Sequence, residues 1–388
     1  MNHPLAGIRV LDMSRVLAGP FAGRMLADLG ADVVKVEPPD GDVTRNWGAR
    51  INGQAGYFNQ QNVGKRGICV DLDVAGGADL IKRLVAKADV LIENFRPDVM
   101  GRLGLGYDVL KQVNPRLVML SISGFGHNGP ESRRAAYAPI VHAESGLIAR
   151  QKKVTGAPAA DIAVSIADTN AALHGLVGLL SALLMRQRTG VGQHIDIAMV
   201  DAMLVTDDAL HYTVDKAEHL KPMPSEVWDT AAGTLLIASD FRHVWKQLIT
   251  RGGVDDPTPE NASLEEKIEI RRATARAFFK NLPGREAVIK ALDRMNLAWG
   301  DVREGAQALD LPTVKHRGTI TQVDDGAGGK RPVVQSPYRF SDAASGARGA
   351  SPRQGEHNDE VLADWLGFDR GAVDALRSSG VLVSVDGV

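Results

Sequence analysis

The chain lacks the residues that build disulfide or metal frameworks. Cysteine occurs once in 388 residues, at Cys69. A single cysteine excludes an internal disulfide and a thiolate metal cluster, and it suits a reducing compartment. The ten histidines are scattered and show no HExxH or similar ligand spacing. We therefore expect no bound metal.

The chain also lacks an excess of one charge and a long hydrophobic run. The net charge is −2, so no strong field attracts nucleic acid or an anionic membrane. The longest apolar run, residues 176–185, is interrupted by Gly178 and Ser181 and is too short to span a bilayer. The N-terminus has no signal-peptide pattern. We expect a soluble cytoplasmic protein without nucleic-acid or membrane partners.

Alternating strand and helix patterns fill the first 120 residues. Residues 8–12 and 32–36 are predicted strands, and residues 21–29 form a predicted helix that ends at Gly30. The alternation continues over residues 67–72, 78–88, 90–92 and 117–122. Such alternation predicts an α/β fold with a mainly parallel sheet covered by helices.

A long helix is predicted over residues 169–188. Its spacing of Leu173, Val177, Leu180 and Leu184 predicts one apolar stripe. Gly190 follows the helix and can take the left-handed cap position. Residues 194–200 then return as a strand.

Changes in composition suggest three segments. Residues 1–214 form the first part of a large domain, and the charged, helix-rich residues 215–312 form a small inserted domain. Residues 313–388 contain a predicted hairpin around the glycine-rich DDGAGGK, and then two short surface helices.

Asp168 stands in the stretch AVSIADTNAALHG, where a hydrophobic run gives way to the predicted helix. An aspartate before a helical run usually accepts hydrogen bonds from the first turn, so the pattern alone favours a helix cap. A chemical role is the alternative. The two roles do not exclude each other, because helix N–H groups also stabilise charge.

A glycine turn near the N-terminus resembles a dinucleotide-binding loop at first sight. A strand, a turn, a helix and a second strand ending in Glu37 follow one another, but the turn reads Gly19-Pro20-Phe21-Ala22-Gly23 and lacks GxGxxG. We therefore interpret it as an ordinary tight turn rather than a nicotinamide site. Basic residues follow at apparent strand ends or in loops, where phosphates are often bound, at Arg45, Lys65, Arg66, Arg96 and Arg102.

Several sequence blocks in one order resemble family III CoA-transferases. The blocks are LAGIRVLDMSRVLAGPFAGRMLADLGADVVKVEPPDGD, NVGKRGICVDL, ADVLIENFRPDVMGRLGLGYDVL, NPRLVMLSISGFGHNGP, ADTNAALHG, RQRTGVGQHIDIAMVDA and GEHNDEVLADWLG. The resemblance runs along nearly the whole chain and is weakest in the small domain. It implies a Rossmann-like large domain with an inserted small α+β domain, and two subunits interlocked as a homodimer.

The same resemblance implies a nucleophile and a mechanism. It places the family's catalytic aspartate at Asp168, which would carry the acyl group and then CoA in covalent form. Acyl-CoA and a small carboxylic acid are the implied substrates, with no tightly bound cofactor. The positions that match the family's CoA contacts are Val16, Leu17, Ala18, Val70, Asp71, Leu72, Asp73, Asn94, Phe95, Arg96, Arg102, Ala136, Tyr137 and Ala138. For Arg102, a helix C-terminal cation is the structural alternative.

Departures from the resembled family bear on the reaction. Formyl-CoA transferase has glutamine where this chain has Leu17 and an arginine near Pro38-Pro39, so oxalate and formate are not the expected substrates. The related 2-methylacyl-CoA racemases need an acid/base pair, and their histidine falls on the run Ala136-Tyr137-Ala138, which has none. His127, His142 and His174 are the nearby substitutes.

Three functions therefore remain open. They are a CoA-transferase, a racemase or epimerase, and a catalytically silent CoA-binding protein. We favour the transferase, acting on a short, dicarboxylic acid with succinyl-CoA or acetyl-CoA as the donor. This preference for the acids rests only on their frequency in the resembled family.

Overall fold

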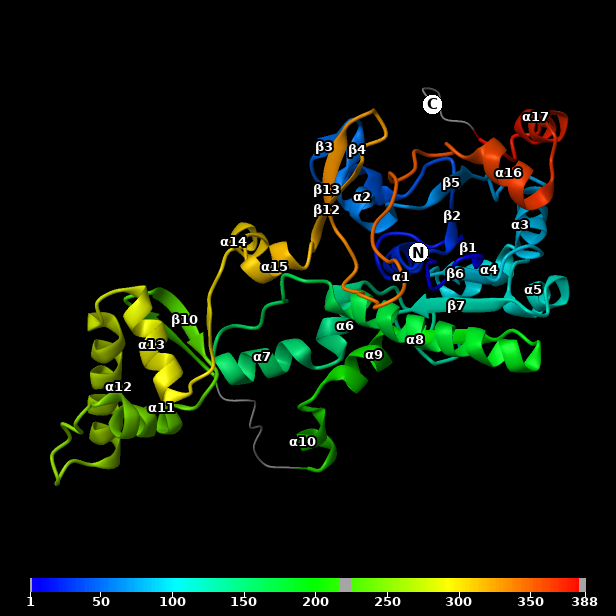
Figure 1. Cartoon of the computed structure of the whole chain (residues 1–388). Coiled ribbons are helices and arrows are strands. Elements are labelled where there is room, and N and C mark those ends of the chain that lie inside the picture. Colours follow the sequence, from blue (N-terminus) through cyan, green and yellow to red (C-terminus); the bar gives the residue numbers. More distant parts are fainter. Residues whose placement is uncertain (1, 217–224, 384–388) are drawn as a thin grey trace. The chain divides into compact units, whose positions relative to one another are not determined.

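The computed structural model describes residues 2–216 and 225–383 (Figure 1). The chain divides into two compact units. The first consists of Met1–Asp207 together with Lys315–Val388, and the second is the intervening Asp208–Val314. The domain limits predicted at residues 214 and 312 stay a prediction.

Six parallel strands form the central sheet of the first unit. Their order is β5-β2-β1-β6-β7-β8 (Figure 1). The bounds are β1 Arg9–Asp12, β2 Asp32–Glu37, β5 Arg66–Cys69, β6 Val90–Glu93, β7 Val118–Ser123 and β8 His194–Ala198. Val10 of β1 pairs with Val33 of β2 on one side and Val90 of β6 on the other. The predicted α/β class is confirmed, and the last predicted strand ends at Ala198 because a helix begins at Met199.

Helices connect these strands. The helices and 3-10 turn of the first unit up to residue 207 are α1 Ala18–Asp28, η1 Val43–Asn46, α2 Gly56–Asn62, α3 Gly77–Val85, α4 Pro97–Arg102, α5 Tyr107–Val113, α6 Ala138–Glu144, α7 Leu147–Thr155, α8 Ile166–Thr189 and α9 Met199–Thr206. Helix α1 starts three residues before its predicted start, so Gly19 and Pro20 lie inside its first turn. Gly190 ends α8 with a φ of 74°, as predicted.

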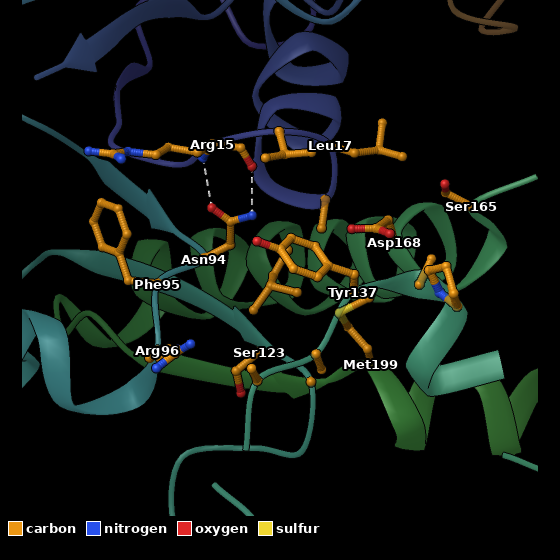
Figure 2. Close-up of a pocket in the computed structure, with 18 of the residues that line it drawn as sticks. Arg15, Leu17, Asn94, Phe95, Arg96, Ser123, Tyr137, Ser165, Asp168 and Met199 are labelled. Carbon is orange, nitrogen blue, oxygen red and sulfur yellow. Dashed lines mark hydrogen bonds between the residues drawn. The ribbon is translucent and has the colours of Figure 1, made fainter. Parts of the chain in front are cut away.

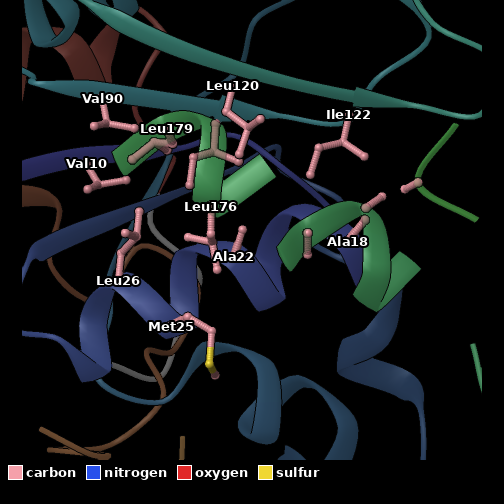
Figure 3. Packing of buried hydrophobic residues seen from close by; sticks show 14 of the residues in the cluster. Val10, Ala18, Ala22, Met25, Leu26, Val90, Leu120, Ile122, Leu176 and Leu179 are labelled. Carbon is pink, nitrogen blue, oxygen red and sulfur yellow. The ribbon is translucent and has the colours of Figure 1, made fainter. Parts of the chain in front are cut away.

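Alternate strand residues point to opposite sides of the sheet. Both sides are buried, because each one packs in its own hydrophobic cluster. Val10, Val90 and Leu120 face α1 and α8 in one cluster (Figure 3). Leu11 and Leu91 belong to the cluster on the other face, which includes residues of α3, α5 and the C-terminal helix α16 Asn358–Leu366.

The predicted apolar stripe of α8 is present, but it is exposed in the single chain. Leu173, Val177, Leu180 and Leu184 are 44%, 66%, 37% and 61% exposed. The buried face carries smaller residues and other leucines: Ala167, Ala171, Ala172, Gly175, Leu176, Leu179, Ala182 and Leu183. Close packing explains the choice, since a Cβ on Gly175 would lie only 3.0 Å from Leu120 Cδ1. Both faces are apolar, so spacing alone did not identify the buried one.

Helix α8 is longer than the apolar run that the sequence analysis identified within it. Among the described residues, α8 is the one helix that is long and apolar enough by composition to cross a membrane, with a mean hydropathy of 1.2. The run of residues 176–185 is only part of this helix, which spans Ile166–Thr189. Packing in the core accounts for the apolar face toward α1 and the sheet.

The end of the chain returns to the first unit. Strands β12 Ile320–Asp324 and β13 Lys330–Val334 form the predicted antiparallel hairpin, and α16 and α17 Arg370–Ser378 are the two predicted helices. The short pair β3 Arg50–Ile51 and β4 Gln54–Ala55 is also antiparallel. Helix α15 spans Pro312–His316.

The second unit has its own core around a three-stranded antiparallel sheet in the order β11-β10-β9. Its elements are α10 Leu210–Val214, β9 Glu226–Thr230, β10 Gly233–Ile237, α11 Phe241–Gln247, η2 Leu248–Gly252, α12 Leu264–Asn281, α13 Arg285–Met295, β11 Trp299–Asp301 and α14 Gly305–Leu309. Ser263 and Glu266 form a capping box that starts the charged helix α12.

Candidate functional site

A pocket of about 520 Å³ lies where the strand order changes direction (Figure 2). Strands β1 and β6 are neighbours, while the chain continues from β1 toward β2 and from β6 toward β7. Ligands bind at such a switch point in doubly wound sheets, outside the carboxyl ends of the strands. The segments that follow β1 and β6 both line this pocket.

Most of the predicted site residues meet in this pocket. They come from four separate stretches of the chain: Val16, Leu17 and Ala18; Asn94, Phe95 and Arg96; Ala136, Tyr137 and Ala138; and Asp168.

The remaining predicted residues do not line the pocket. Val70 is buried and bridges to Leu382, while Asp71, Leu72 and Asp73 follow in the next loop. Arg102 is the last residue of α4, and its Nε lies 3.0 Å from Asp98 Oδ2. Its side chain is 69% exposed, which suits the helix C-terminal role. A CoA contact for these residues stays a prediction.

Asp168 is inside its helix rather than capping it. Helix α8 begins at Ile166, so Asp168 is its third residue, and the N-cap residue is Ser165. The cap interpretation is therefore wrong. The acidic side chain still suits the first turn, where the helix dipole favours negative charge.

Three backbone N–H groups face the Asp168 carboxylate. They belong to Ala18, Ala138 and Asp168 itself, and Ala18 and Ala138 are the first residues of α1 and α6. Burial raises the pKa of Asp168 to about 6, and these N–H groups act in the opposite direction. The carboxylate is thus partly desolvated but still largely ionised at neutral pH.

The turn that carries Ala18 is held in an unusual conformation. Val16 has a φ of 68°, which a β-branched residue rarely adopts. Its N–H donates to Asp42 Oδ2 at 3.2 Å, and Asp42 in turn lies 3.2 Å from Lys35 Nζ. Asn94 accepts from the Arg15 N–H at 2.7 Å and donates to the Arg15 carbonyl at 2.8 Å (Figure 2). The surrounding structure therefore fixes this turn.

Three arginines line the pocket, and two of them, Arg15 and Arg96, supply its positive charge. Figure 2 shows Arg15 and Arg96 on the side away from Asp168, with Phe95 between them. The Arg15 guanidinium lies 5.7 Å from the centre of the Phe95 ring. Arg134 lies 5.0 Å from the Phe125 ring centre, and its charge is balanced by Glu131 at 2.8 Å and by Glu144. Guanidinium groups match phosphate oxygens, so this side of the pocket suits a phosphorylated ligand.

Sequence reasoning missed several pocket residues. Arg15 directly precedes a predicted residue, and Arg134 lies two positions before Ala136, so extending the predicted loops would have found both. No sequence pattern indicates Trp47 and Tyr57. They meet because the β3–β4 pair folds the chain between them, which places their ring centres 5.2 Å apart. Burial, followed by the charges of Asp168 and Asp42, raises the pKa of Tyr57 to about 12. Its hydroxyl therefore stays protonated.

Glu37 is not available to a nucleotide ribose. Its carboxylate accepts two hydrogen bonds from Arg45, at 2.8 and 2.5 Å, and one from the Asp42 N–H. This arrangement agrees with an ordinary turn rather than a nicotinamide site. In the part of the chain that the structure describes, no group of three or more His, Cys, Asp or Glu side chains is placed to hold a metal.

Two of the three nearby histidines, His127 and His142, are engaged in other contacts. His127 Nδ1 lies 3.0 Å from Asp196 Oδ1, and its backbone N–H donates to Asp196 Oδ2. His142 contacts Asp161 and the N–H of Ala167 through its two ring nitrogens. Ala136, Tyr137 and Ala138 bring no imidazole to the pocket.

Comparison with known proteins shows to which family the chain belongs. Residues 5–358 match CoA-transferase family III. A succinate–glutarate CoA-transferase of Agrobacterium fabrum is 34% identical over 95% of this chain and 97% of its own length. A formyl-CoA:oxalate CoA-transferase of Streptomyces coelicolor is 31% identical over 97% and 99%.

A solved structure shares the whole fold. The crystal structure of a CaiB/BaiF family protein from Brucella suis has a TM-score of 0.79 and 33% sequence identity, over 94% of this chain and 100% of that one. The sequence relatives and the solved structure thus agree with the family match over residues 5–358. The chain is an enzyme that belongs to CoA-transferase family III.

Proposed function

We propose that this enzyme moves CoA from an acyl-CoA donor to a carboxylic acid acceptor through covalent intermediates on Asp168. The observation that supports this most strongly is the half-buried Asp168 carboxylate, which faces backbone N–H groups of three helix starts inside a pocket with arginines. A carboxylate is ionised at neutral pH without a general base, so it can act directly as a nucleophile.

The reaction has four steps on this residue. Asp168 attacks the donor thioester carbonyl and expels the CoA thiolate, which gives a mixed anhydride. The thiolate then attacks the Asp168 carbonyl, releases the donor acid as a carboxylate and leaves an aspartyl-CoA thioester. The acceptor carboxylate attacks that thioester to give a second anhydride and free thiolate. Thiolate attack on the acceptor carbonyl forms the new acyl-CoA and restores Asp168.

The helix starts suit the charge that each addition step develops. Every attack on a carbonyl carbon places negative charge on the carbonyl oxygen, and fixed N–H donors stabilise such an oxyanion. The N–H groups of Ala18 and Ala138 already face the Asp168 carboxylate, so they are candidates for this role. They require no reorganisation, because each is the first residue of a helix.

CoA would lie along the arginine side of the pocket. Arg15 and Arg96 would bind its phosphates, and the Phe95 ring offers a surface on which adenine can stack. The acyl end would then reach Asp168. For the acids, we propose a short dicarboxylate acceptor with succinyl-CoA as donor, supported by relatives named for succinate and glutarate.

A second copy of the chain is part of this proposal. We propose an interlocked homodimer in which the exposed α8 stripe is covered by the partner. The four residues of this stripe, Leu173, Val177, Leu180 and Leu184, are exposed in the single chain. A contiguous apolar surface of this kind on one helix is typical of an interaction site.

Mass spectrometry of acyl-CoA exchange tests the proposed reaction. The protein is incubated with succinyl-CoA and a pool of carboxylic acids, and new acyl-CoA species are identified. We expect Asp168→Asn to lose more than about 1,000-fold in rate, as is typical when a covalent nucleophile is removed. Asp201→Asn is the control, since Asp201 is an exposed first-turn aspartate of α9 outside the pocket.

Three results would contradict the proposal. Exchange at the native rate in Asp168→Asn would exclude the nucleophile. Racemisation of a chiral 2-methylacyl-CoA without exchange would identify a racemase instead. CoA binding without either reaction would identify a silent CoA-binding protein.

A further inference from the structure

His142 joins two helices directly behind the proposed nucleophile. It lies on α6, and its side chain is only 1% exposed. The backbone N–H of Ala167, the second residue of α8, donates to His142 Nε2 at 3.2 Å. On the other side of the ring, Nδ1 lies 2.8 Å from Asp161 Oδ1.

These two contacts define the form of the ring. An N–H donor can only be accepted by a nitrogen with a free lone pair, so Nε2 carries no proton. The proton of the neutral ring is then on Nδ1, which donates it to Asp161. Asp161 Oδ1 also accepts from the Ile162 N–H at 2.9 Å, so the segment that leads into α8 is tied to the same carboxylate.

Helix α8 lacks the usual local cap. The first N–H groups of a helix have no partner within the helix and are commonly satisfied by the N-cap side chain. Ser165 occupies the N-cap position, but its side chain makes no capping hydrogen bond. His142 satisfies the Ala167 N–H in its place, from a different helix.

This remote cap connects two of the helix starts that face Asp168. Ala138 begins the helix that carries His142, and Ala167 directly precedes Asp168. A shift of α8 relative to α6 would therefore move the carboxylate away from the Ala138 N–H. Misplacement of reacting groups by about 1 Å lowers rates by about 100-fold.

We infer that His142 is a positioning residue for Asp168, which caps α8 from α6 and is held in the required tautomer by Asp161. The inference rests on the proposed role of Asp168 as nucleophile. It assigns the imidazole no proton transfer, because both ring nitrogens are already engaged.

A matched pair of variants separates positioning from proton transfer. Glutamine can replace both contacts of the ring, since its amide oxygen accepts and its amide nitrogen donates. Leucine can replace neither. We expect His142→Leu to lower kcat by about 10- to 100-fold with a smaller change in KM, and His142→Gln to recover most of kcat.

Hydrogen exchange gives a second readout that does not depend on activity. In the full-length protein, we expect amides of residues 162–172 to exchange about 2- to 30-fold faster in His142→Leu, the range for loss of a helix cap. His142→Gln should remain close to the native rate. If His142→Leu does not fold, Asp161→Ala serves instead. Asp161 is 34% exposed, so its removal leaves the core intact, and without it no carboxylate holds the proton of His142 on Nδ1.

The outcomes distinguish the inference from the proposed function. Native exchange rates and native kcat in the folded leucine variant, or in Asp161→Ala if that variant is used, would overturn the cap. A glutamine variant with native amide protection but the low kcat of His142→Leu would show that the imidazole does more than position. Wild-type protein that transfers no CoA would reject the proposed function, while the amide rates would still confirm or overturn the cap.

Discussion

At the scale of single residues, Asp168 is subject to two opposing effects. Burial disfavours its charge and raises its pKa to about 6, while the N–H groups of Ala18, Ala138 and Asp168 itself favour the charged form. A carboxylate with a raised pKa is less solvated and a stronger base than a surface aspartate. Its environment therefore matches the nucleophilic role better than a helix-capping role does.

The pKa of Asp168 predicts the acid limb of the activity profile. Because the nucleophile must be ionised, kcat/KM should fall as pH decreases through about 6 and should be nearly constant at higher pH. Initial rates of CoA exchange across this range measure the midpoint. A midpoint near the ordinary aspartate value of about 3.9 would contradict a desolvated carboxylate.

The sequence pattern alone did not predict the role of Asp168. An aspartate at the start of a helical run has the same local pattern whether it caps the helix or reacts. The resemblance to known sequences supplied the proposal that Asp168 is the nucleophile. The pocket, the N–H groups and the desolvation arise from segments spread between Arg15 and Met199, which no local pattern contains.

At the scale of elements, a buried lysine ties β1, α1 and α2 together beneath the glycine turn. Lys65 Nζ donates to Asp12 Oδ2 at 2.7 Å, to the Pro20 carbonyl at 2.9 Å and to Asn62 Oδ1 at 2.9 Å. Burial lowers the pKa of Lys65 to about 8, and the Asp12 charge opposes this shift. The lysine therefore holds the elements that carry Val16 and Ala18.

Removal of Lys65 should destabilise the first unit. In Lys65→Met the buried Asp12 loses its positively charged partner, so we expect the free energy of unfolding to fall by about 3–5 kcal/mol. Urea denaturation measures this change. Lys82→Met is the control, because Lys82 forms a surface pair with Asp79 at 3.2 Å and should contribute under about 1 kcal/mol. Equal effects of the two substitutions would contradict the argument.

Elements were more predictable than their orientation. Strand and helix periods identified most strands of the central sheet, the α8 helix and the β12–β13 hairpin, because these patterns are local. The buried face of α8 was not predicted, since both of its faces are apolar and only the close approach of Leu120 selects Gly175 and its alanine neighbours.

At the scale of the whole molecule, the exposed stripe of α8 bears on assembly. We expect the protein to elute with twice the mass of one chain in size-exclusion chromatography with light scattering. Val177→Glu combined with Leu180→Glu should shift it to the monomer, because buried unpaired carboxylates oppose association. Leu264→Glu is the control, since Leu264 is 74% exposed on α12 of the second unit.

If the wild-type protein is a monomer, or if the Val177→Glu and Leu180→Glu variant still dimerises, the exposed stripe of α8 is not the dimer interface. The oligomeric state followed from the resemblance and not from residue patterns. Local patterns contain no information on a partner chain, and they predicted the apolar stripe of α8 without showing what covers it.

The divided first unit also has a consequence for the order of events during synthesis. Strand β5 is at the edge of the sheet, and its partner segment lies almost 300 residues later, where Asn358 accepts from the Cys69 N–H at 2.9 Å. The second unit is continuous in sequence and leaves the ribosome before that segment. Until the chain is nearly finished, β5 is therefore an uncovered edge, and such edges promote aggregation. Truncation before α16 should yield insoluble protein even though every pocket residue is present.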